Sequence, residues 1–75
     1  MKPRKITVWW VDSASPERYW NYPDGLETWP HRIVTCGYLL RENKRVVVVA
    51  SSLGPHAVGG ALTIPKRAIT KRRNK

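Results

Sequence analysis

The chain has 75 residues, of which 41% are hydrophobic, and it carries a formal net charge of +9 at neutral pH. This length predicts a single domain with a small core, and the apolar content excludes a wholly disordered chain. Its one cysteine, Cys36, excludes an intramolecular disulfide, and its apolar runs are too short to cross a membrane. No signal peptide is evident, so we expect a cytoplasmic protein.

The positive charge lies at the two ends of the chain. Residues 1–5 carry three bases and no acid, residues 6–45 carry five of each, and residues 46–75 carry six bases and no acid. A balanced body with basic ends is expected of a domain that binds phosphate groups or an acidic partner. A net charge away from zero can also serve only to keep a small domain soluble.

The first part of the chain predicts one strand and a long loop. Residues 6–11 are β-branched and aromatic, which favours a strand. Residues 13–30 contain three prolines and a Pro-Asp-Gly turn sequence, so they predict a loop. Within this loop, Ser15 as N-cap and Pro16 in the first helical position predict one short helical turn.

The middle of the chain predicts two strands joined by a tight hairpin. Residues 32–41 form the first, in which Gly37 indicates a bulge or bend. Cys36 lies on an apolar face of that strand, where a free thiol is expected to be buried and inert. Asn43 is suited to a positive φ in the hairpin turn. Residues 45–51 contain four consecutive valines, which are typical of a central strand in a curled sheet.

The last part of the chain predicts two more strands and a tail. Residues 58–64 form a fourth strand with a bend at Gly60, and residues 68–70 form a short fifth strand. Residues 71–75 are expected to be a basic tail with nothing to bury. The residues expected to face inward from the fourth strand are Val58, Leu62 and Ile64. The predicted fold is all-β, with residues 1–70 forming one five-stranded antiparallel barrel, closed or nearly closed.

The order of these elements is similar to that of the SH3-like and Sm-like small barrels. More narrowly, the chain resembles a family of small, functionally unassigned proteins encoded by bacteriophages and prophages. The resemblance implies a viral accessory protein that acts in the host cytoplasm, and it supplies no biochemical activity. The basic tail departs from the family pattern. The segments that carry the resemblance are residues 8–13 with their Trp-x-Asp core, 35–39, 46–51, and Ile64-Pro65-Lys66 with Ile69.

The sequence predicts a protein that is not an enzyme and that holds no metal or cofactor. Cys36 could pair with His31 or His56 as a nucleophile and base, but its apolar setting argues against this. The carboxylates show no spacing that places two of them across a substrate. One cysteine and two histidines do not complete a structural zinc site. Gly59 and Gly60 lack the helix that follows a phosphate-binding loop.

Two groups of residues are candidates for binding. Aromatic side chains of the long loop could stack on unpaired bases or contact a protein, and they could equally fold over the barrel as a lid. These are Trp20, Tyr22 and Trp29. Basic side chains near the chain ends could neutralise phosphates. These are Lys2, Arg4, Lys5, Lys66, Arg67, Lys71, Arg72, Arg73 and Lys75.

These features support two hypotheses of function. The first is a barrel that binds nucleic acid, either DNA or RNA, through its basic ends. The second is an inhibitor or adaptor that binds an acidic host protein, such as an enzyme or a defence complex, with the aromatic loop at the interface. The charge at both ends favours the first, and the sequence leaves the oligomeric state open.

Overall fold

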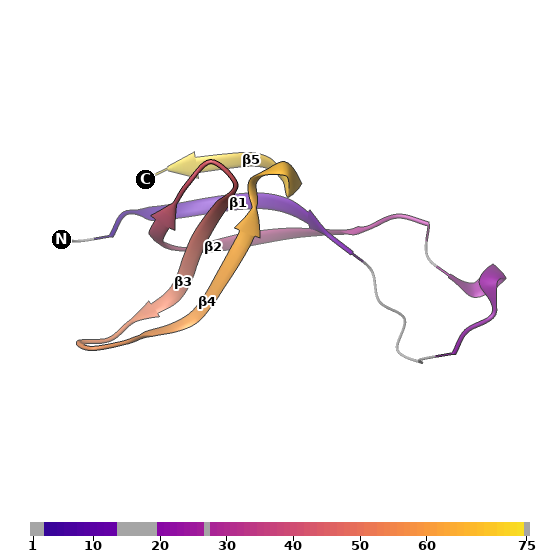
Figure 1. Ribbon diagram of the computed structural model, residues 1–75, viewed down its shortest axis with the longest axis horizontal. Coiled ribbons are helices and arrows are strands. Elements are labelled where there is room, and N and C mark those ends of the chain that lie inside the picture. The colour runs from indigo at the N-terminus through magenta and orange to yellow at the C-terminus, as the bar shows by residue number, and fades with distance from the viewer. Residues whose placement is uncertain (1–2, 14–19, 27, 75) are drawn as a thin grey trace.

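The computed structural model describes residues 3–13, 20–26 and 28–74. Its five strands form one antiparallel sheet in the order β4-β3-β2-β1-β5, so the all-β prediction is confirmed (Figure 1). Two short 3-10 helices, η1 (Pro23–Gly25) and η2 (Lys66–Ala68), lie in the connections. The strands are β1 (Lys5–Asp12), β2 (His31–Glu42), β3 (Val46–Leu53), β4 (Val58–Pro65) and β5 (Ile69–Asn74).

The sheet is curled but not closed into a barrel. In Figure 1, β3 and β4 cross β1, β2 and β5 at a steep angle. Within the part of the chain that the structure describes, the edge strands β4 and β5 form no backbone ladder with each other. β4 pairs with β3 from Val46↔Pro65 to Leu53↔Val58, and its other edge has no strand partner in this sheet. The predicted barrel is therefore an open, curled sheet.

The core fills the concave side of this sheet. Alternate residues of β1 are buried there, and Trp10 among them donates its indole N–H to Thr35 Oγ1 at 2.9 Å. From β4 only Ile64 is buried, whereas Val58 and Leu62 are exposed, contrary to prediction. Val58 lies opposite Leu53 at the turn end of the β3–β4 hairpin, whereas Leu62 lies opposite the buried Val49 but on an edge strand of the sheet. The buried hydrophobic residues are Ile6, Val8, Trp10, Val47, Val49, Ala50 and Ile64.

Local backbone features agree with the sequence in part. Gly60 has the positive φ that a bend requires, at 63°. The bulge lies between Leu39 and Arg41 rather than at Gly37, and Gly37 instead permits a close approach of β3. No described residue other than glycine has a positive φ, so the expectation for Asn43 is wrong. The Asn43 side chain shapes the turn, because its Oδ1 accepts hydrogen bonds from two backbone N–H groups of the turn.

The largest difference from prediction is at the C-terminus. Residues 71–74 belong to β5 and pair with β1, whereas the sequence predicted a strand of residues 68–70 followed by a tail. The hydroxyl of Thr70 also donates to the Trp9 carbonyl at 3.2 Å. The edge of β1 offers backbone N–H and C=O groups to residues 71–74. This pairing makes them a strand although they have few apolar side chains to bury. The predicted helical turn at residues 15–17 lies outside the described residues.

Candidate functional site

The pairing of β1 with β5 brings the two basic ends of the chain together. Arg73 lies opposite Thr7, and Lys71 lies opposite Trp9. Both ends of the chain therefore lie at the same end of the sheet (Figure 1). The Arg4 carbonyl accepts a hydrogen bond from the Leu39 N–H at 2.7 Å, which holds the N-terminal segment on β2 as well.

The convex side of β2, β1 and β5, here called the outer face, combines aromatic rings with cations. Opposed residues of paired strands share one side of a sheet, so the register places the members of this face. The ammonium of Lys71 lies 4.9 Å from the centroid of the Trp9 ring, and that of Lys5 lies 6.0 Å from the Tyr38 ring. The outer face comprises Lys5, Thr7, Trp9, Val11, Arg32, Val34, Cys36, Tyr38, Lys71 and Arg73.

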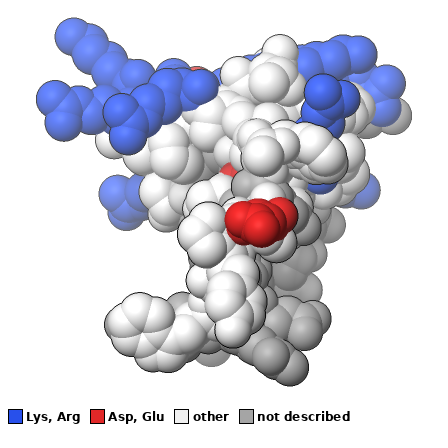
Figure 2. All heavy atoms as spheres, turned by 90° about the vertical axis from the view of Figure 1, so that its right-hand side faces the viewer, with Lys and Arg blue, Asp and Glu red and all other residues white. Residues whose placement is uncertain are grey.

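The outer face is accessible to a ligand. Val34 is 56% exposed, and Trp9 beside it is half-buried. A hollow at this part of the sheet is lined by Trp9, Val34 and Lys71 together with Trp10, Val11, Arg32, Ile33 and Thr70. Cations next to aromatic rings suit a ligand that has both negative charge and flat apolar groups. Figure 2 shows Lys and Arg side chains gathered in the upper part of the molecule, level with β5 in Figure 1.

Two of the predicted phosphate-binding residues are engaged within the fold. The Arg72 guanidinium donates to both carboxylate oxygens of Glu42, at 2.8 and 3.2 Å. The ammonium of Lys66 lies 2.7 Å from the same carboxylate. Hydrogen bonds from Arg72 and then from Lys66 lower the pKa of Glu42 from 4.5 to about 2. Glu42 therefore neutralises part of the charge that the sequence assigns to ligand binding.

The remaining predicted cations are distributed between the outer face and η2. Lys5, Lys71 and Arg73 lie on the outer face, and Arg4 lies just before it. Arg67 is exposed on η2. Among the described residues, none of these five cations forms an ion pair. Lys2 and Lys75 lie outside the described residues.

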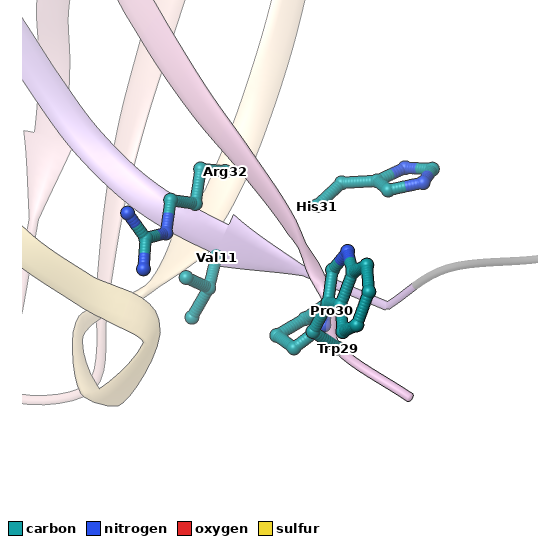
Figure 3. Close-up of a pocket in the computed structure, with 5 residues that line it drawn as sticks. All are labelled: Val11, Trp29, Pro30, His31 and Arg32. Atoms are coloured by element: carbon teal, nitrogen blue, oxygen red, sulfur yellow. The ribbon is translucent and has the colours of Figure 1, made fainter. Parts of the chain in front are cut away.

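The predicted aromatic residues of the loop point to solvent rather than cover the sheet. Trp20, Tyr22 and Trp29 are 84%, 87% and 70% exposed, so the lid interpretation is wrong for these rings. A pocket at the base of the loop is lined by Trp29 and Pro30 of the loop together with Val11 of β1 and His31 and Arg32 of β2. Figure 3 shows Val11 and Arg32 to one side of this strand end, with His31 extending away from them.

The structure also corrects the setting of the cysteine. Cys36 is exposed on the outer face, not buried, because it lies opposite Thr7 rather than opposite a core residue. Its Sγ lies 3.5 Å from Thr7 Oγ1. His31 is five positions away on β2, or about 16 Å at the strand rise of about 3.3 Å per residue. Residues 3–13, 20–26 and 28–74 contain no group of three or more metal-ligating side chains.

Some residues that could contact a ligand were not among the sequence candidates. Trp9 and Tyr38 are the aromatic members of the outer face, and Lys44 and Arg45 are basic residues of the β2–β3 turn. The alternation in β1 could have placed Trp9 on the same side as Lys5. Only the pairing of strands could have placed Tyr38 and Lys71 there as well.

Comparisons with protein-family models, with curated proteins and with solved structures find no match to this chain. Within the described part of the chain, no helix has the length and apolarity needed to cross a membrane. The resemblance to phage-encoded proteins stays a prediction, and function is argued from the site itself.

Proposed function

We propose that this domain is a non-enzymatic binding protein that takes single-stranded nucleic acid on its outer face. The observation that carries the proposal is the pairing of β5 with β1, which lays Lys71 and Arg73 beside Trp9 and next to the basic N-terminal segment. In this proposal the cations contact phosphates and the Trp9 and Tyr38 rings contact bases. Because base faces are available only in unpaired strands, a single strand is preferred to a duplex.

The salt dependence of binding tests the role of the cations. We expect the double variant Lys71→Gln with Arg73→Gln to bind a labelled single-stranded 12-mer with a shallower dependence of log affinity on log salt. Two lost phosphate contacts reduce that slope by about 1.4 for a single strand, at about 0.7 each. Fluorescence anisotropy over a salt series measures the slope for both DNA and RNA.

Two further variants separate charge from structure in this test. The exchange Lys71→Arg with Arg73→Lys keeps both charges and should keep the slope. Tyr38→Ala should weaken binding by about 1–3 kcal/mol without a change of slope, as expected for a lost stacking contact. A full-length protein with no measurable affinity for single- or double-stranded nucleic acid at low salt would end the proposal.

The exposed loop aromatics favour a second candidate function. Large exposed rings such as Trp20, Tyr22 and Trp29 are typical of protein interfaces, where they act as energetic hot spots. The partner in this case is an acidic protein of the host. A pull-down from host lysate with nuclease treatment tests it, because a stoichiometric protein that survives nuclease and is lost in Trp20→Ala with Trp29→Ala supports this candidate. Loss of every partner on nuclease treatment supports the first.

A further inference from the structure

A second basic cluster lies away from the outer face, between the β2–β3 turn and η2. The two segments line an open hollow together with two apolar residues, Val46 of β3 and Pro65 of β4, which lie opposite each other. Its lining has four cations, two from the turn and two from η2. We call it the turn hollow, and its residues are Lys44, Arg45, Val46, Pro65, Lys66 and Arg67.

Backbone hydrogen bonds hold the two sides of the turn hollow together. The Lys66 N–H donates to the Arg45 carbonyl at 2.7 Å, which attaches η2 to the turn. On the other side, Asn43 Oδ1 accepts from the N–H groups of Arg45 at 2.7 Å and Val46 at 2.9 Å. The cationic side chains therefore extend from backbone segments that hydrogen bonds hold together. This lowers the entropic cost of ordering these segments when a ligand binds between them.

The charges around the turn hollow are strongly unbalanced. Within the described parts of the chain, Lys44, Arg45 and Arg67 form no ion pair, and Lys66 pairs only with Glu42. That carboxylate is shared with Arg72, so the one acid contacts two cations and leaves the other three cations of the turn hollow without an acidic partner among the described residues. Like charges placed together repel one another, and a bound anion relieves this repulsion.

We propose that the turn hollow binds a phosphate group. The guanidinium groups of Arg45 and Arg67 and the ammonium group of Lys44 offer the forked and point-charge donors that phosphate oxygens accept. The phosphate group comes either from a free or terminal phosphate or from the backbone of a nucleic acid. The proposal does not depend on the outer face, because it uses different residues.

Pyrophosphate is the probe for this site. We expect saturable shifts of the backbone amide resonances of residues 44–46, 66 and 67 when the full chain is titrated with it. The exposed pair Arg45→Gln with Arg67→Gln should weaken this binding at least tenfold. Lys71→Gln with Arg73→Gln removes the same charge from the outer face and should change it less than twofold. Equal losses in the two variants, or shifts spread over all basic residues, would show general electrostatics only and overturn the proposal.

A single-stranded oligonucleotide without terminal phosphates distinguishes the two sources. If Arg45→Gln with Arg67→Gln leaves its binding unchanged but abolishes that of pyrophosphate, the hollow takes free or terminal phosphate. If the same variant flattens the salt slope by about 1.4, the hollow takes backbone phosphates. Absence of saturable shifts with both probes overturns the proposal. Loss of oligonucleotide binding in the outer-face variant alone leaves it intact, so the two proposals can fail separately.

Discussion

Gly37 lies on the concave side of β2, where β3 folds over it. A Cβ atom at this position would press against the carbonyl oxygen of Ala50 and lie 2.7 Å from Val49 Cγ1. Both neighbours are buried, so neither can move away freely. The missing side chain of Gly37 is thus what permits the close approach by which the sheet curls.

Gly37→Ala is expected to lower the free energy of unfolding by about 1–3 kcal/mol, because the added methyl overfills a packed contact. Urea denaturation measures the change. Gly25→Ala serves as the matched control, since a Cβ there meets nothing within 4 Å, and it should stay within about 0.5 kcal/mol of the parent. Equal stability of the Gly37 variant and the parent would contradict the close approach.

Among the strands, β5 owes its formation to backbone pairing with β1 more than to its own sequence. Three of its six residues are Lys or Arg, and it completes the edge of β1 that β2 leaves open. It also carries Arg72 to Glu42 at the far end of β2. The basic C-terminal residues are therefore part of the folded domain as well as of the proposed interface.

A chain that ends at Thr70 is expected to be less stable by at least about 2 kcal/mol, because it loses several backbone hydrogen bonds worth about 0.5–1.5 kcal/mol each. Amide exchange in β1 should rise as its edge opens to water. Lys71→Gln with Arg73→Gln removes charge but keeps the backbone, so it should retain stability. If the truncated chain were as stable as the parent, residues 71–74 would be a tail after all.

In the whole molecule, the Glu42 side chain links three elements, β2, β5 and η2, of a sheet that is not closed into a barrel. From the end of β2 it contacts Arg72 of β5 and Lys66 of η2. These contacts hold the β5 edge and the β4–β5 connection against the β2–β3 hairpin. Side-chain ion pairs thus connect β5 and η2 to the end of β2 in a sheet whose edge strands form no ladder with each other.

The stability of the protein should depend on the ionisation of Glu42. Because folding lowers the pKa of this carboxyl from 4.5 to about 2, its contribution is complete above pH 4.5 and is lost as the pH falls from there toward 2. Glu42→Gln should cost about 1 kcal/mol at neutral pH, the upper range for exposed ion pairs. Denaturation of both proteins across this pH range should show their stabilities converge on acidification. A difference as large at pH 2 as at neutral pH would contradict this role.

The sequence by itself determined the features that depend on local chemistry. The β-branched run of residues 46–49, the proline-rich loop and the bend at Gly60 follow from backbone preferences of single residues and short segments. The all-β class follows from the same preferences. Five of the described candidate cations are exposed, namely Arg4, Lys5, Arg67, Lys71 and Arg73.

Only the tertiary structure decided which residues meet. β2 has apolar residues on both sides, so alternation could not tell whether Cys36 or Thr35 faces the core, and pairing with β1 settled it. The segment of residues 71–74 lacks apolar alternation, and it is a strand because the edge of β1 offers it hydrogen bonds. The same pairing places the Lys71 ammonium over the Trp9 ring. The Glu42 carboxylate forms ion pairs with Lys66 and Arg72 and neutralises part of their charge. These contacts join residues far apart in the chain, and local sequence preference carries no information about them.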